Sequence, residues 1–204
     1  MPLLPILTKH CPAEAVSYCY QLWQTYPFHF KLSKARKGKY GDYRYSAKGR
    51  IVHQISVNEN LNPYSFLLTY IHEVAHLLTF QQYRKRINPH GKEWKKNFKE
   101  LMAPLLTTTI FPASILEPLC QYMANPRATS CSDAALMKAL HLQDLSESQA
   151  FLTGLSLGEK FVFHKRLFEK IASKRTRILC KELSSGKQYL ISGQATVEIV
   201  REEV

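Results

Sequence analysis

The segment His72-Glu73-Val74-Ala75-His76 constrains this chain most, because it places three polar side chains within an apolar helical pattern. Asn62-Pro63 predicts the start of this helix, with Asn62 as the N-cap and Pro63 as the first helical residue. The helix is expected to run to about Gln82, with a broad apolar face. A buried helix with two histidines and a glutamate leaves polar groups without partners unless something binds them.

The spacing of these residues indicates a metal. Two histidines four residues apart lie about 40° apart around a helix axis, so His72 and His76 point the same way. Their imidazoles can bind one tetrahedral zinc ion at about 2.0–2.1 Å. Glu73 lies about 100° further round, where its carboxylate can take a proton from a water that attacks a carbonyl. The simpler alternative is three polar residues on a solvated face.

A catalytic zinc site requires a third protein ligand, and several later residues could supply it. Thr79 and Gln82 stand where a metzincin has glycine and histidine, which excludes that class. His90 lies between Pro89 and Gly91, and these neighbours indicate a defined turn. A glutamate from a later helix is the other option, with three available: Glu93, Glu100 and Glu117.

The zinc-helix segment followed by Pro89-His90-Gly91-Lys92-Glu93-Trp94 resembles the SprT-like metallopeptidase family. The resemblance is specific over roughly residues 60–100. It implies that His72, His76 and His90 bind Zn²⁺ and that Glu73 is the general base. It also implies a compact, minigluzincin-like α+β fold, and some family members degrade proteins crosslinked to DNA.

Patterns elsewhere predict helices packed on a small antiparallel sheet. The expected helices span 12–26, 92–102, 112–122 and 132–140. The expected strands of this part span 28–32, 40–45 and 50–57. Short runs then predict a small β-rich barrel or sheet, with strands at 161–163, 177–183, 188–191 and 196–200. The predicted domains are 1–125 for the metallopeptidase, 126–150 for a helical connector and 151–204 for the β-rich part.

The cysteines bear on the compartment and on the C-terminal part. Many SprT-like proteins carry a cysteine-rich zinc ribbon after the protease domain, whereas this chain has only Cys131 and Cys180 there. The five cysteines are odd in number and widely spaced, which favours a reduced, cytoplasmic compartment. No apolar run approaches the roughly 20 residues of a membrane span. Residues 1–7 are too short for a targeting segment.

The formal net charge of +12 predicts contact with a polyanion, and nucleic acid is the commonest one in a cell. Basic clusters at Lys31–Arg50 and Arg84–Lys99 bracket the zinc helix in sequence, and a third lies at 165–177. Each cluster alone is also typical of a solvated face. Tyrosines interleave with the first cluster and could stack on bases or pack a sheet face: Tyr40, Tyr43 and Tyr45.

These features favour a zinc-dependent metalloendopeptidase that acts on protein substrates, including ones bound to DNA. The alternative is a nucleic-acid-binding, transcription-linked protein that keeps its zinc site for structure. Glu73 argues against this alternative, because a structural site needs no base and is usually closed by four protein ligands. A hydrolase of another amide or ester remains open, because the motif determines the water chemistry and not the substrate.

Overall fold

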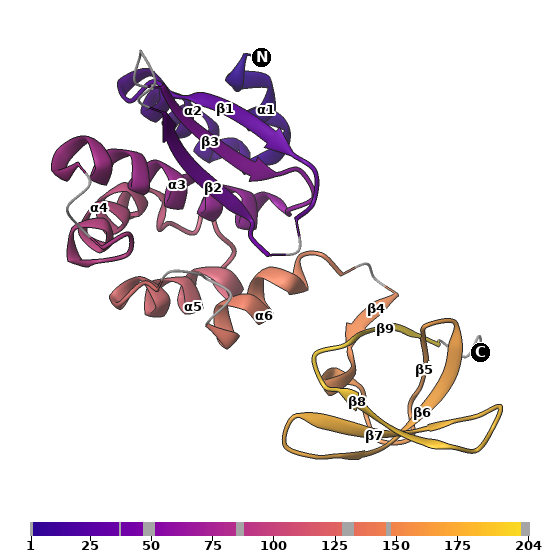
Figure 1. Cartoon of the computed structure of the whole chain (residues 1–204). Helices are drawn as coiled ribbons and strands as arrows, with labels where there is room; N and C mark the ends of the chain where they lie inside the picture. The colour runs from indigo at the N-terminus through magenta and orange to yellow at the C-terminus, as the bar shows by residue number, and fades with distance from the viewer. Residues whose placement is uncertain are drawn as a thin grey trace. The chain divides into compact units, whose positions relative to one another are not determined.

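The computed structural model describes residues 2–36, 38–46, 52–84, 88–127, 133–145 and 148–200. The chain divides into two compact units, Met1–Leu140 and His141–Val204 (Figure 1). The division falls within 126–150, the segment for which the sequence predicts a helical connector. Helices and sheets are mixed in the chain, which confirms the α+β class. No helix in the described ranges is long and apolar enough to cross a bilayer.

The first unit consists of helices around a small sheet. Its helices are α1 (Leu3–His10), α2 (Ala13–Thr25), α3 (Pro63–Tyr83), α4 (Lys92–Met102), α5 (Ala113–Ala124) and α6 (Ala134–Leu142). The bounds of α4 are those predicted, whereas the sequence analysis does not predict α1. Pro5 obscures α1, although a proline in the first turn costs no hydrogen bond. The Asp133 side chain accepts from the Leu136 N–H at 3.0 Å and so caps the start of α6.

The sheet of the first unit is mixed, not antiparallel as predicted. Its strands are β1 (His29–Ser33), β2 (Gly41–Ser46) and β3 (Val52–Asn58), in the order β1-β3-β2. β2 and β3 pair antiparallel, but β1 runs parallel to β3. The alternating pattern of a strand shows which face is buried and not its direction, so β1 could not be oriented from sequence. This order leaves β2 at an edge of the sheet.

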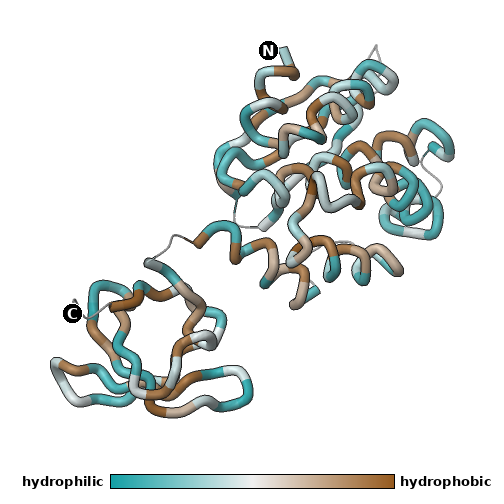
Figure 2. Tube along the Cα trace, turned by 180° about the vertical axis from the view of Figure 1, so that it is seen from behind, coloured by the Kyte–Doolittle hydropathy of each residue, from teal (hydrophilic) through white to brown (hydrophobic). Residues whose placement is uncertain are grey.

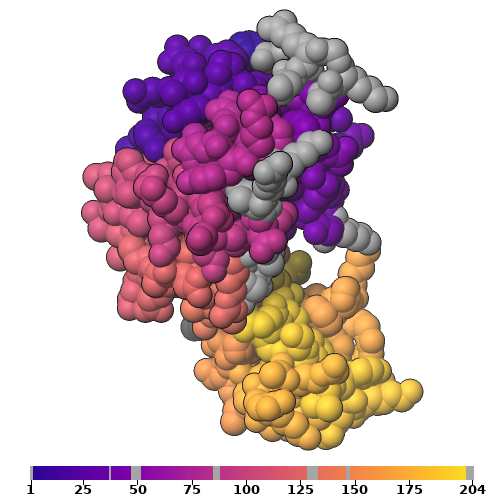
Figure 3. All heavy atoms as spheres, turned by 60° about the vertical axis from the view of Figure 1, so that its left-hand side comes forward, coloured from indigo at the N-terminus to yellow at the C-terminus, as the bar shows by residue number. Residues whose placement is uncertain are grey.

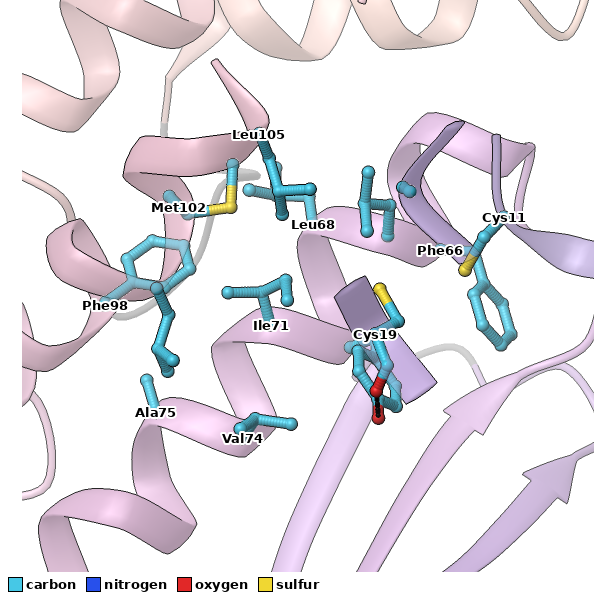
Figure 4. Packing of buried hydrophobic residues seen from close by; sticks show 14 of the residues in the cluster. Cys11, Cys19, Phe66, Leu68, Ile71, Val74, Ala75, Phe98, Met102 and Leu105 are labelled. Atoms are coloured by element: carbon cyan, nitrogen blue, oxygen red, sulfur yellow. Dashed lines mark hydrogen bonds between the residues drawn. The ribbon is translucent and has the colours of Figure 1, made fainter. Parts of the chain in front are cut away.

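Helix α3 runs through the core of the first unit. Its buried side chains include Ile71 and Val74, and both are fully enclosed. Figure 4 shows Ile71 lying among side chains of other elements, with Phe98 and Met102 of α4 nearby. On the face drawn in Figure 3, magenta atoms of the α3–α4 region lie directly against the indigo and purple N-terminal part. The polar side chains of α3 are therefore held in a closely packed frame.

The second unit is a six-stranded sheet in which every pairing is antiparallel. The strands are β4 (Gln149–Phe151), β5 (Lys160–Phe163), β6 (Arg166–Ser173), β7 (Arg177–Glu182), β8 (Gln188–Ser192) and β9 (Thr196–Ile199). They lie in the order β4-β9-β5-β6-β7-β8. Figure 2 shows hydrophobic and hydrophilic stretches alternating along this part of the chain. The structure thus supports the predicted β-rich sheet, while closure into a barrel stays a prediction.

Strand β6 is missing from the sequence prediction because a lysine occupies one of its inward positions. Lys170 is 3% exposed, and its Nζ donates to the backbone carbonyls of Leu152, Thr153 and Leu155 at 3.2, 3.3 and 2.5 Å. The three acceptors replace the water that the ammonium loses on burial. A search for alternating apolar residues therefore misses a strand in which a charged residue occupies an inward position.

Candidate metal centre

Local sequence signals determine where α3 begins and hence where its histidines lie. The Asn62 side chain accepts from the Ser65 N–H at 2.9 Å, and Pro63 occupies the first turn. This confirms the predicted start. The helix continues to Tyr83, so His72 and His76 stand one turn apart on one continuous helix.

His90 lies in the turn that leads into α4. The Gly91 N–H donates to the Asn88 carbonyl at 2.9 Å, and the Lys95 N–H donates to the Gly91 carbonyl at 3.0 Å. The first bond closes the turn around His90, and the second begins the helix. Gly91 also lies close to Asn88, because an added Cβ would be 3.2 Å from the Asn88 oxygen. These contacts present the His90 ring towards α3.

The structure brings the three predicted ligands together. The Nε2 atom of His76 lies 3.2 Å from that of His72 and 3.0 Å from that of His90. The His90 and His72 Nε2 atoms are 3.3 Å apart. These three side chains are close enough to hold a metal ion. Two nitrogens that each lie 2.0–2.1 Å from a tetrahedral ion are separated by roughly 3.3–3.4 Å, so the triangle fits such an ion closely.

The protonation of these histidines also suits a metal. Burial, and then the neighbouring His76 and His90, hold the pKa of His72 well below its usual range. Burial and His90 lower the pKa of His76 to about 3, and burial lowers that of His90. The rings are therefore neutral at pH 7, and neutral imidazole is the form that binds metals.

Glu73 stands beside the histidine cluster and is buried at 6% exposure. Its carboxyl lies against the backbone of β2, close to Gly41 and to the Tyr43 N–H, which favours its ionised form. Burial and the nearby Asp42 raise the pKa of Glu73 to about 8, although Arg36 and Lys39 act in the opposite direction. A carboxyl with a pKa near neutrality can both accept and release a proton in that range.

Gly41 is a residue of this site that sequence reasoning missed. A Cβ at this position would overlap the Glu73 Oε1 and lie 2.6 Å from the Thr69 Cγ2. The start of β2 therefore contacts the carboxyl through its bare backbone. The signal was present in the sequence as a glycine in an alternating strand, which often marks a close backbone approach.

Trp94 forms an aromatic wall that contacts all three histidines. Its ring centroid lies 4.7 Å from His72, 5.4 Å from His76 and 4.8 Å from His90. The side chain is fully buried, and its Nε1 has no hydrogen-bond partner among the described residues. Phe98 stacks on Trp94 at 4.8 Å and also contacts His72 at 5.6 Å. The spacing of Trp94 and Phe98, four residues apart, predicts that they share one side of α4, but it does not show that they line this site.

The alternative third ligands do not join the cluster. Among the residues that the structure describes, the metal-compatible group contains histidines alone. Glu93 and Glu100 instead lie 4.0 and 3.9 Å from the Nζ atoms of Lys92 and Lys96. Glu117 is exposed on α5.

Tyr43 and Tyr45 pack on the sheet face and on α3, which supports the second interpretation of these tyrosines. The Phe80 ring lies 6.3 Å from that of Tyr43 and 4.2 Å from that of Tyr45. Tyr43 also lies parallel to His76, with centroids 6.4 Å apart. Its hydroxyl is 3.0 Å from the Nδ1 of His53.

Parts of the clusters Lys31–Arg50 and Arg84–Lys99 lie outside the described residues, namely 37, 47–50 and 85–87. Within the described parts, some cations have partners in the chain. Lys39 pairs with Asp42 at 2.7 Å, and Lys99 donates to the Ala124 carbonyl at 2.6 Å. Lys95 donates to the side chain of Asn125 at 2.7 Å. Lys99 thereby satisfies a carbonyl at the C-terminal end of α5, as cations there commonly do.

Comparison with known proteins agrees with the resemblance. Residues 15–114 match the sequence model of the SprT-like family. Protein SprT of Vibrio parahaemolyticus is 44% identical over 62 residues, which cover 28% of this chain and 37% of that protein. Protein SprT of Glaesserella parasuis is 55% identical over 31 residues, 15% of this chain and 19% of that protein. The chain thus matches well under half the length of these relatives. No solved structure matches it.

Proposed function

We propose that this chain, which belongs to the SprT-like family, is a zinc-dependent endopeptidase. His72, His76 and His90 would hold the metal, and Glu73 would act as the general base. The observation that carries the proposal is the convergence of three Nε2 atoms within 3.0–3.3 Å beside a buried carboxyl. A structural zinc site is usually closed by four protein ligands, whereas three ligands leave a position for reaction.

Zinc is the metal that this donor set suits best, because imidazole nitrogens in a tetrahedral arrangement are typical zinc ligands. When bound, zinc supplies a Lewis acid that polarises a carbonyl and acidifies water. Glu73 must be ionised to accept a proton from that water. Arg36 and Lys39 already favour its charged form, and a cation on the neighbouring histidines acts in the same direction.

An extended segment of a protein is the substrate that the neighbouring sheet favours. β2 is an edge strand, and an exposed edge can pair with a peptide in an extended conformation. Glu73 lies directly beside this strand. The net charge of +12 supports substrates that are associated with nucleic acid, and the wide cysteine spacing supports a cytoplasmic location.

The test is incubation of the zinc-loaded protein with an unfolded protein, with and without single-stranded DNA, followed by mass spectrometry of the products. We expect internal peptide fragments, and none after treatment with a chelator. Retention of DNA without any cleavage would instead support the transcription-linked alternative. If a small ester is hydrolysed while the unfolded protein stays uncleaved, the chain is a hydrolase of another amide or ester.

A further inference from the structure

We propose that Tyr43 is a positioning residue that fixes both the His76 ring and the Glu73 carboxyl. The inference rests on the proposed function, because it concerns the ligand and base assigned there. Tyr43 lies on β2, next to α3 (Figure 1). Its contacts reach both of these groups.

The Tyr43 ring orients a metal ligand. Its plane lies 4° from that of His76, with centroids 6.4 Å apart. Trp94 contacts the same imidazole at 5.4 Å, so His76 is held by rings from both the sheet and α4. Groups that hold a ligand in place without touching the metal commonly change metal affinity about 10- to 100-fold when they are removed.

The main chain of Tyr43 orients the base. Its N–H lies close to the Glu73 carboxyl and favours the ionised form, and the Gly41 backbone lies against the same group. Ring and amide belong to one residue, so a single position of the sheet contacts both groups. The ligand and the base are therefore coupled through a single position of β2.

The hydroxyl anchors this arrangement. It lies 3.0 Å from the Nδ1 of His53 on β3, the strand that pairs with β2. The two rings are also stacked, with centroids 6.0 Å apart. Tyr43 is thus tied to the neighbouring strand at one end of its side chain while its ring faces His76. Loss of the hydroxyl alone should loosen the ring without removing it.

The test compares Tyr43→Leu with Phe30→Leu. Phe30 is an aromatic residue of the same sheet that packs on α3 through Phe66 and Tyr70, at 6.4 and 6.0 Å. Zinc affinity is measured by competition with a chelator, and the visible absorption of the cobalt(II)-loaded protein reports the ligand geometry. We expect Tyr43→Leu to weaken zinc about 10-fold and to shift the cobalt spectrum. Phe30→Leu should leave both unchanged.

Tyr43→Phe, which keeps the ring, should restore most of the zinc affinity. A folded Tyr43→Leu protein with the zinc affinity and cobalt spectrum of the wild type would overturn the inference. If that variant does not fold, Tyr43→Met takes its place. Its zinc affinity and cobalt spectrum are then compared with those of the wild type in the same way. Failure of the wild type to bind either metal would overturn the proposed function as well. A wild type that binds zinc but cleaves no protein would overturn the proposed function alone.

Discussion

Glu73 in the first unit and Glu182 in the second are both 6% exposed, yet their surroundings differ in kind. Glu182 accepts from the Arg166 guanidinium and from the Ser185 hydroxyl, and these contacts lower its pKa to about 2. Among the described residues, no side-chain cation is hydrogen-bonded to Glu73, and burial raises its pKa to about 8. The pair teaches that burial alone does not assign a role: a fully partnered carboxylate supports the fold, whereas an incompletely partnered one is available for chemistry.

The largest expected effect is on the rate of proteolysis, which should distinguish Glu73 from Glu182. Glu73→Gln removes the proton acceptor and keeps the shape, so hydrolysis of an unfolded protein should fall about 10²- to 10⁴-fold. Zinc affinity should remain, because Glu73 is not among the clustered ligands. Glu182→Gln is the control and should leave the cleavage rate unchanged. Equal cleavage by both variants, measured as fragment yield over time, would remove the distinction between the two sites.

The sequence predicted those parts of the site that depend on local signals. The Asn62 cap and Pro63 locate α3, and helical geometry then places His72 and His76 on one side. These two steps depend on residues close together along the chain, which is why a single sequence is enough for them. The proline and glycine on either side of His90 indicated a turn there, but the residues alone left a later glutamate as an alternative third ligand, and the family resemblance selected His90.

The remaining parts depend on contacts between distant segments. Gly41 and Tyr43 contact Glu73 across about thirty residues, and no spacing rule connects them. The direction of β1 depends on where the chain crosses the sheet, which its alternating pattern does not record. Strand β6 was missed because Lys170 is buried by carbonyls that lie far away in sequence.

A smaller effect is expected from the space around Glu73. Gly41→Ala adds a methyl group that would overlap the carboxyl, so Glu73 must move. A misplacement of this kind should slow cleavage about 10- to 100-fold while zinc affinity is kept. Gly38→Ala is the matched control, because a Cβ there meets nothing within 4 Å. Full activity of Gly41→Ala would show that the carboxyl needs no fixed position.

The pH dependence of stability should have opposite signs at the two carboxyls. In chelator-treated protein, the raised pKa of Glu73 means that the folded state retains a proton that the unfolded state loses above about pH 4.5. The wild type should therefore lose stability relative to Glu73→Gln as the pH rises from 4.5 to 8, by at most about 1.4 kcal/mol per pH unit.

Glu182 should show the reverse. Its lowered pKa contributes stability above about pH 4.5, and this is lost as the pH falls towards 2. The wild type should therefore be more stable than Glu182→Gln near neutral pH, and this difference in the free energy of unfolding should shrink in acid. Denaturant titrations of the three proteins at a series of pH values measure both slopes. If the stability of the wild type relative to each variant changes with pH in the same direction for both carboxyls, their environments do not differ as described.

The smallest expected effect is on the Tm of the second unit, and it depends on how Arg166 binds Glu182. Its guanidinium lies over the rings of Phe168 and Tyr189, at 5.3 and 4.7 Å, while it binds Glu182. Arg166→Lys keeps the charge but loses the planar group that stacks, so the Tm of the second unit should fall by a few degrees. Arg175→Lys, at an exposed position, should not change it. Equal Tm values for both variants in calorimetry would mean that charge alone satisfies Glu182, and stacking would then have no part in keeping this carboxylate structural.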